Sequence, residues 1–203
     1  MIPSAAMVFM TGISRCSMAM WLQGVFMKTI SIISAVLLSL LVSISSEART
    51  LAVSPEHFHF VIEAQSKDRP EVLWARLIAP AQWWHANHTY SGDANNLSLD
   101  PQAGGLWRED WDGGSVAHGK VLYAKPPTLL RLEAPFGPLQ EKAIDAIWTI
   151  SISPLETGSS VTFEFIANGS AFSKLDELAP AVEMVKTQAL KTLVQPIANE
   201  VSK

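Results

Sequence analysis

Residues 104–135 read GGLWREDWDGGSVAHGKVLYAKPPTLLRLEAP, and this stretch decides the fold. Its centre, Asp112-Gly113-Gly114, is typical of a hairpin turn, because glycine takes the positive φ angles that tight turns need. The flanking segments, LWREDW and SVAHGKVLYA, are rich in large side chains and are expected to be paired strands. The Pro126-Pro127 pair then separates the return strand from a third strand, TLLRLEA. Strands this rich in aromatic residues, in a chain that ends in a long amphipathic helix, favour a curved sheet that closes on a helix and leaves an apolar cavity.

The segments before this stretch predict one strand and two short helices. Residues 56–65 alternate between apolar and polar side chains, which indicates a strand. Asp68 and Glu71 have the spacing of a capping box, and the helix that they begin is expected to run through Ile78. The sequence AQWWH, opened by Pro80, predicts a second short helical turn. A brief strand is expected at Leu97–Leu99.

The segments after this stretch predict two more strands and a final helix. Residues 143–153 and 160–167 alternate strongly, and residues 136–140 are interpreted as a loop. An apolar stripe at helical spacing, up to Pro196, predicts the long helix: Val182, Val185, Ala189, Leu190 and Leu193. The sequence therefore predicts an α+β domain, in which a curved antiparallel sheet of about six to seven strands is wrapped on a long C-terminal helix, with two short helices after the first strand.

The N-terminal residues are interpreted as a targeting segment. Met27-Lys28 precedes an apolar run at 30–44, and small side chains precede a cleavage point after Ala48, as in a secretory signal. An apolar run of this length is short for a membrane span, which needs about 20 residues. Residues 1–26 fit no part of a signal and are interpreted as an over-extended start, although translation from Met1 stays an alternative to Met27.

This interpretation gives a signal peptide at 27–48 and one domain at 49–203. The mature protein is then expected in the periplasm or secreted, with no stable membrane anchor. The only cysteine of the sequence, Cys16, precedes the cleavage point and is absent from the mature protein. Neither a disulfide nor thiol chemistry is therefore expected. The 15 basic and 19 acidic residues are interspersed and give a net charge of −4, which excludes nucleic acid as an expected partner. His85 and His88 lie in a polar segment, so neither a metal nor another cofactor is expected.

Several short motifs, taken in order, resemble the START-like (SRPBCC, Bet v 1-like) superfamily of helix-grip folds. The likeness is greatest to the branch related to the activator of Hsp90 ATPase and to polyketide cyclases, and it covers nearly all of residues 49–203. The motifs that carry it are Pro70–Trp74, Trp83-Trp84, Gly104–Trp107, His118–Val121, Pro126–Leu130, Gly158 with Val161-Thr162, and the final helix. The resemblance implies a deep cavity between the sheet and the last helix. It leaves chemistry open, because the superfamily hosts carriers, cyclases, dehydratases and chaperone cofactors.

Three side chains are candidate catalytic groups. Glu109 lies between Trp107 and Trp111 on one face of its strand, where burial would raise the pKa of its carboxyl and suit it to general acid catalysis. His118 lies on the return strand within reach of that strand and faces either the cavity or solvent. Tyr123 is the third candidate, as a phenol in the same cavity. Core packing or solvent exposure is the alternative for each.

A larger group of apolar side chains is expected to line the cavity or gate its mouth, with ordinary core packing as the alternative. It comprises Trp83, Trp84, Trp107, Trp111, Phe136, Trp148, Phe172 and Leu175.

Three functions are compatible with this sequence. The first is an exported module that binds an apolar small molecule, such as a lipid, an isoprenoid or an aromatic metabolite. The second is a cyclase-like or dehydratase-like enzyme that uses Glu109 with His118 or Tyr123. The third is a protein-interaction domain, similar to the chaperone activators, with an exposed apolar patch on the outer face of the sheet or near Trp83-Trp84. The sequence leaves the oligomeric state open.

Overall fold

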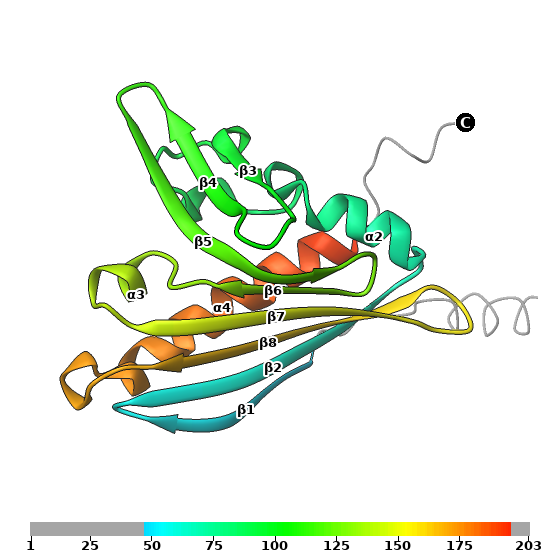
Figure 1. Ribbon diagram of the computed structural model, residues 1–203. Coiled ribbons are helices and arrows are strands. Elements are labelled where there is room, and N and C mark those ends of the chain that lie inside the picture. Colours follow the sequence, from blue (N-terminus) through cyan, green and yellow to red (C-terminus); the bar gives the residue numbers. More distant parts are fainter. Residues whose placement is uncertain (1–46, 196–203) are drawn as a thin grey trace, which may run out of the picture. The chain divides into compact units, whose positions relative to one another are not determined.

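The computed structural model describes residues 47–195, in which one antiparallel sheet lies against a long helix (Figure 1). The strands are β1 (Glu47–Ser54), β2 (His57–Ser66), β3 (Leu97–Leu99), β4 (Leu106–Trp111), β5 (Gly114–Lys125), β6 (Leu129–Glu133), β7 (Asp145–Pro154) and β8 (Ser159–Asn168). The helices are α2 (Pro70–Leu77), α3 (Pro138–Glu141) and α4 (Leu175–Val194), with 3₁₀ turns η1 (Pro80–Gln82), η2 (Ala86–His88), η3 (Ala94–Asn96) and η4 (Ala171–Ser173). The eight strands lie in the order β1-β2-β8-β7-β6-β5-β4-β3.

The predicted fold class is confirmed, with one strand more than expected. The additional strand is β1, which pairs with β2 at the edge of the sheet. Its side chains are almost all exposed, so the apolar alternation that reveals a half-buried strand is missing from its sequence. Residues 136–140, interpreted as a loop, contain the start of the short helix α3, which Pro138 opens.

Most of the predicted targeting segment lies outside the described residues. The predicted cleavage point, after Ala48, lies two residues into β1, where Glu47 pairs with Glu63 and Ala48 pairs with Ile62. Cleavage there would leave the larger part of β1 in place. Among residues 47–195, no helix combines the length and the apolar character that a membrane crossing requires.

The inner face of the sheet is an aromatic surface built by alternation along the strands. Phe60 of β2 lies opposite Phe165 of β8, which in turn lies opposite Trp148 of β7. The rings of Phe60 and Phe165 stack with their centroids 5.5 Å apart. Because successive side chains of a strand point to opposite faces, these rings all face α4. They form the part of the hydrophobic core that belongs to the sheet.

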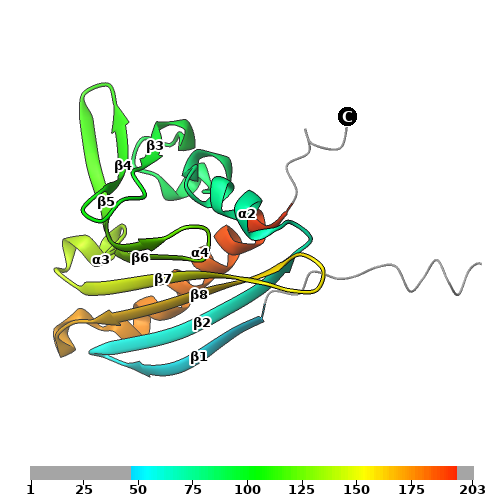
Figure 2. The ribbon, with the colours of Figure 1, turned by 45° about the vertical axis from the view of Figure 1, so that its right-hand side comes forward.

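The sheet bends sharply along β4 and β5. The register shifts between Trp107 and Arg108 and again between Val121 and Tyr123, and such bulges bend strands and increase their twist. Figures 1 and 2 show the β4–β5 hairpin rising away from the plane of β6, β7 and β8. Gly119 lies at the inner side of this bend, where a Cβ atom would come within 2.7 Å of the Glu133 carbonyl oxygen. The bend therefore requires glycine at this position.

The C-terminal end of α4 is fixed by hydrogen bonds to two other elements. Buried Arg76 of α2 donates from Nη1 to the Leu193 carbonyl at 2.8 Å, and Ser66 of β2 donates to the Val194 carbonyl at 2.9 Å. Arg76 also donates from Nη2 to Asp68 at 2.9 Å. A cation at a helix C-terminus interacts favourably with the exposed carbonyl groups there. These bonds anchor the end of α4, while its preceding turns lie over the space that the bent sheet opens.

Candidate functional site

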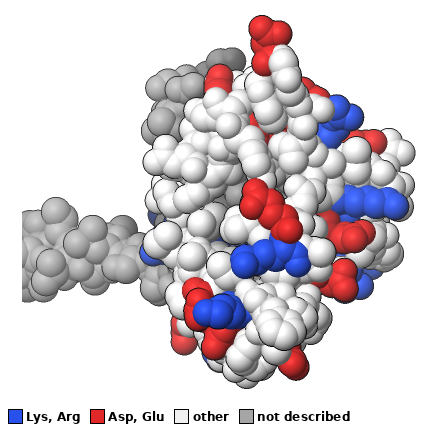
Figure 3. All heavy atoms as spheres, turned by 90° about the vertical axis from the view of Figure 1, so that its left-hand side faces the viewer, with Lys and Arg blue, Asp and Glu red and all other residues white. Residues whose placement is uncertain are grey.

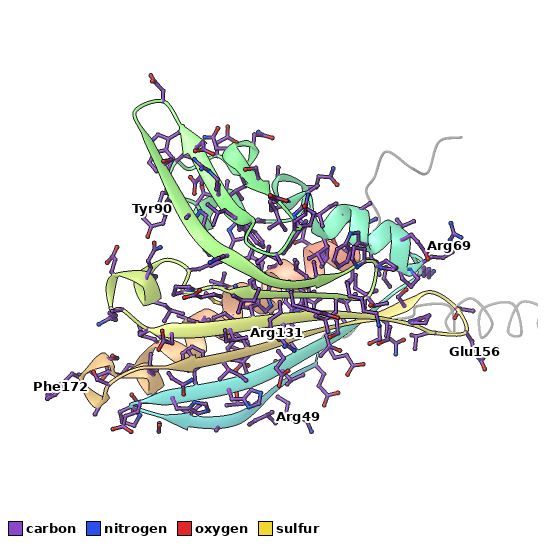
Figure 4. The ribbon with its side chains drawn as sticks, in the orientation of Figure 1. Arg49, Arg69, Tyr90, Arg131, Glu156 and Phe172 are labelled. Atoms are coloured by element: carbon purple, nitrogen blue, oxygen red, sulfur yellow. The ribbon has the colours of Figure 1, made fainter. Side chains whose placement is uncertain are left out.

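A cavity of about 410 Å³ lies beneath the middle of α4. Its walls come from the loop around η2, from β5, from the Phe136 loop with α3, from β8 and from α4. The lining residues are Trp84, Asn87, His88, Thr89, Tyr90, His118, Phe136, Gly137, Pro138, Leu139, Glu141, Phe165, Ala181, Val182, Val185 and Lys186. Tyr90 is about half exposed, and Figure 4 shows it between the β4–β5 hairpin and α3. Figure 3 views the molecule from this side, where acidic and basic side chains are interspersed with uncharged surface.

Glu109 is a buried carboxylate that links two segments of the cavity wall, the loop after η2 and strand β5. It accepts hydrogen bonds from the backbone N–H groups of Tyr90 and Ser91 and from Nε2 of His118 at 2.9 Å. Burial raises the pKa of Glu109, but the hydrogen bonds from Ser91, Tyr90 and His118 lower it by more, so the net shift is downward. The side chain is therefore ionised at neutral pH. This overturns the expectation of a raised pKa and a general acid, because the strand places the carboxylate among donors and not between bare indole rings.

His118 is the member of this pair that faces the cavity. It is buried, its ring lies 5.3 Å from that of Phe136, and it lines the cavity wall while Glu109 lies behind it. Because Glu109 is ionised, Nε2 of His118 carries the proton of their hydrogen bond, which leaves Nδ1 as an acceptor. Burial lowers the pKa of His118; Glu109 partly opposes this shift, and a positive charge on Lys186 would add to it. A neutral imidazole oriented by a carboxylate is suited to accept a proton.

Lys186 of α4 is buried among aromatic rings on the opposite wall. Its Nζ lies 3.3 Å from the ring centroid of Trp148 and 4.2 Å from that of Phe136, and the rings of Phe165 and Trp84 lie at 5.0 and 5.1 Å. It makes no hydrogen bond within residues 47–195. Burial lowers the pKa of Lys186 far below that of an ordinary lysine, because the apolar surroundings disfavour the ammonium form.

The sequence does contain a signal for Lys186, which the apolar pattern of the helix obscures. Lys186 follows Val182 by four residues and precedes Leu190 by four, so it lies within the stripe that faces the sheet. Lysine is almost never fully buried unless it is paired. A cation in the middle of a core-facing stripe therefore indicates either a buried ion pair or a functional amine.

Two of the predicted lining residues do line the cavity, and three more are core residues beside it. Trp84 and Phe136 contribute to the wall. The buried rings of Trp83, Trp107 and Trp148 pack edge-on, tilted or stacked against these two and one another, with centroids 5.1–6.4 Å apart. Because Trp83 and Trp84 are buried, they form no exposed docking patch of the kind that the protein-interaction function predicts.

The remaining candidates lie away from the cavity. Tyr123 is 48% exposed, because the bulge beside it turns its side chain outward, and Phe172 is 94% exposed in η4 (Figure 4). Trp111 packs over Gly114 at the end of the hairpin, and Leu175 is a core residue at the start of α4. Tyr123 is thus removed from the catalytic candidates. In the part of the chain that the structure describes, no three His, Cys, Asp or Glu side chains are grouped to hold a metal.

Comparison with solved structures finds the same fold in bacterial proteins. A protein from Rhodobacter sphaeroides has a TM-score of 0.50 and 20% identity, over 73% of this chain and 96% of that one. Protein NE0264 from Nitrosomonas europaea has a TM-score of 0.50 and 12% identity, over 75% and 100% of the two chains. EF2215, a conserved protein of unknown function from Enterococcus faecalis, has a TM-score of 0.50 and 11% identity, over 76% of this chain and 80% of that one. No protein-family model and no curated protein matches the chain. These likenesses support the helix-grip architecture alone.

Replacing Glu109 by Gln should lower the pKa of His118 further, because the negative charge that opposes the effect of burial is lost. The folded state should also lose about 2 kcal/mol at pH 7, since hydrogen bonds to a charged acceptor contribute about 1.5–3 kcal/mol. NMR titration of the His118 ring and urea denaturation measure the two effects. Glu164→Gln, which removes the carboxylate of the more exposed pair with His59, is the control and should leave the His118 pKa unchanged. An unchanged His118 pKa in the Glu109 variant would contradict the assigned electrostatics.

Replacing Lys186 by Met should flatten the pH dependence of stability between pH 7 and 9. In the unfolded chain the lysine keeps its proton up to the ordinary pKa, whereas the folded chain releases it at lower pH, so the unfolded state binds more protons in this window. The free energy of unfolding of the unmodified protein therefore rises with pH, by up to about 1.4 kcal/mol per unit from this group. Urea denaturation at pH 7, 8 and 9 measures the slope. Lys191→Met, at an exposed position of the same helix, should keep the original slope; equal slopes for both variants would show that Lys186 is charged when folded.

Proposed function

We propose that this protein binds an apolar small molecule in the cavity beneath α4, and that it acts after export. The observation that carries the proposal is the cavity itself, whose volume of about 410 Å³ falls within the roughly 300–1,000 Å³ of small-molecule sites. Most of its wall is aromatic or aliphatic, and a few polar groups interrupt it at defined places. Such a composition is typical of sites that take an apolar body and fix its orientation by one polar end.

The distribution of side chains indicates the form of the ligand. Val182 and Val185 of α4 and Leu139 of α3 offer aliphatic surface, and burying apolar ligand area there contributes about 25 cal/mol per Å². His118 and Lys186 are the buried polar residues of the lining, and the remaining polar lining residues come from the η2 loop and α3. The ligand class that fits is a molecule with an apolar chain or ring and one oxygen-bearing group.

The resemblance of the sequence to the START-like superfamily supports the same proposal. That family places its ligands between the curved sheet and the last helix, which is the position of this cavity. The support is limited to the class of function, because relatives on this fold include both carriers and enzymes.

An enzyme is the second candidate, and the Glu109–His118 pair is the observation that favours it. The two groups lie on the same face of the sheet and are hydrogen bonded, with the acceptor nitrogen of His118 left for a substrate. In this candidate His118 is the base, Glu109 orients it, and Tyr123 has no role. The two functions differ in the fate of the ligand: mass spectrometry of the co-purified molecule, before and after incubation with the protein, would show it unchanged for a carrier and converted for an enzyme.

Export is expected to produce a mature chain that begins at Arg49. The observation behind it is the signal-like sequence of residues 27–48, and the expected location is the periplasm or the medium. Cell fractionation followed by N-terminal sequencing measures both. The matched control is a chain with Lys28 replaced by Glu, which removes the positive start of the signal and should retain the protein in the cytoplasm. Recovery of an uncleaved chain from the cytoplasm of the unaltered strain would contradict export.

Replacing Val185 by Trp should weaken ligand binding strongly, because the larger ring would occupy the cavity. Titration of the delipidated protein with octanoate and with a fluorescent apolar probe should show saturable binding, weakened at least tenfold in this variant, which corresponds to about 1.4 kcal/mol. Met184→Trp adds the same ring one residue away, at a position that is 62% exposed, and should bind as the unaltered protein does. Thermal unfolding of both variants verifies that they are folded.

Absence of saturable binding to the unaltered protein would overturn the proposal. Equal loss in both tryptophan variants would place the bound probe on the surface of α4 and not in the cavity.

A further inference from the structure

Lys186 has no structural partner that explains its burial. The residues that face it are aromatic, and no carboxylate lies within ion-pair distance among residues 47–195. The aromatic faces would stabilise an ammonium through cation–π attraction. Burying an isolated ammonium is far more costly, and groups in such surroundings neutralise instead. The balance therefore favours a neutral amine, whose lone pair is available for chemistry.

The neighbours of this amine share a further property. The indole N–H groups of Trp107 and Trp148 are also buried without an acceptor in the described part of the chain. With Lys186, the interior beside the cavity thus holds three donors that lack acceptors. A ligand that brings an oxygen atom would suit this side of the site better than a hydrocarbon would.

The amine is close to both the cavity and the acid–base pair. Phe136 lines the cavity, and its ring lies 4.2 Å from Nζ of Lys186 and 5.3 Å from the ring of His118. Lys186 and His118 both line the cavity, on α4 and β5. The ring of Phe136 therefore lies beside both groups at the cavity wall.

We propose that Lys186 binds its ligand covalently, as an imine with an aldehyde or ketone group. This inference rests on the proposed function, because the apolar part of the ligand must first occupy the cavity. A neutral amine in an apolar pocket is a known route to an activated lysine nucleophile. The site would then select apolar carbonyl compounds over the corresponding acids and alcohols.

The reaction balances with groups that the site contains. The lone pair of Nζ attacks the carbonyl carbon and the C=O π pair moves to oxygen, which gives a carbinolamine after proton transfer from nitrogen to oxygen. The carbinolamine then loses its oxygen as water, and the C=N bond forms. One water is released for each imine, and neither an oxidant nor a reductant is needed. His118, with Nδ1 as acceptor and Glu109 behind it, is placed to pass the proton.

Reductive trapping with octanal tests this inference. The full chain is incubated with octanal and sodium cyanoborohydride at pH 7, digested, and mapped by mass spectrometry. We expect one octyl group on Lys186. An ordinary exposed lysine is neutral in only about 1 of 2,500 molecules at pH 7, so labelling of Lys186 should exceed that of any other lysine by at least about tenfold.

Three variants and one competitor separate the possible origins of the label. Lys186→Met should lose it, whereas Lys191→Met, an exposed lysine of the same helix, should keep it. Val185→Trp should prevent it while leaving the amine in place. Excess octanoate, which has the same chain but forms no imine, should compete with octanal.

The outcomes distinguish this inference from the proposed function. Saturable binding of octanoate without labelling of Lys186 would overturn the imine and leave the binding function intact. Loss of octanoate binding in Lys186→Met, again without labelling by octanal, would instead identify Lys186 as the counter-ion of a carboxylate. Labelling spread evenly over the exposed lysines would also overturn the imine. Failure of the unaltered protein to bind any apolar probe would overturn both.

Discussion

One long helix, α4, must cover much of the inner face of a strongly bent sheet, and the rest of the structure depends on how that helix is held. The last turn of α4 is fixed by Arg76 and Ser66, which bind its terminal carbonyl groups. The bulges in β4 and β5 meanwhile turn the hairpin away from the plane of the other strands. A straight helix that is anchored at one end cannot follow a surface that bends away from it. The cavity lies where the two diverge, and the Phe136 loop and the η2 loop only partly fill it.

The electrostatics of the cavity follow from this arrangement. Glu109, His118 and Lys186 are the buried ionisable groups at this apolar space, and the surroundings of each have a different effect on its pKa. Glu109 receives enough hydrogen bonds to stay ionised, whereas burial favours the neutral forms of His118 and Lys186. A positive charge on His118 disfavours a second positive charge on Lys186, and the reverse also holds. Protonation of one group therefore makes protonation of the other less favourable. The site therefore has a base in the cavity wall and a buried amine beside it, and the carboxylate of Glu109 lies behind the wall.

The sequence was sufficient for the architecture because the inner strands alternate with a strict period of two. Trp148, Phe163 and Phe165 all face the interior as that period requires. The sequence was insufficient to predict β1, because both faces of this strand are exposed and its apolar and polar side chains do not alternate. The site was harder to predict, because its geometry comes from irregular segments: the bulge beside Tyr123 reverses the side that this residue would otherwise face. The contact between Glu109 and the N–H groups of Tyr90 and Ser91 joins a loop to a strand 18 or 19 residues away, and no local sequence pattern predicts such a bond.

Two buried cations in this domain show the difference between a structural and a functional charge. Arg76 donates from Nη1 to a helix terminus and from Nη2 to Asp68, at 2.8 and 2.9 Å, although its Nε has no partner among residues 47–195. Removing either side of these two contacts would leave a polar group unpaired. Lys186 is as deeply buried but makes no such bond, so a methionine of similar length would fill its place without the penalty of desolvation. Packing alone thus gives no reason for an amine at this position. A chemical role does, because the same apolar surroundings that make the ammonium unfavourable also make the free amine available to a carbonyl carbon.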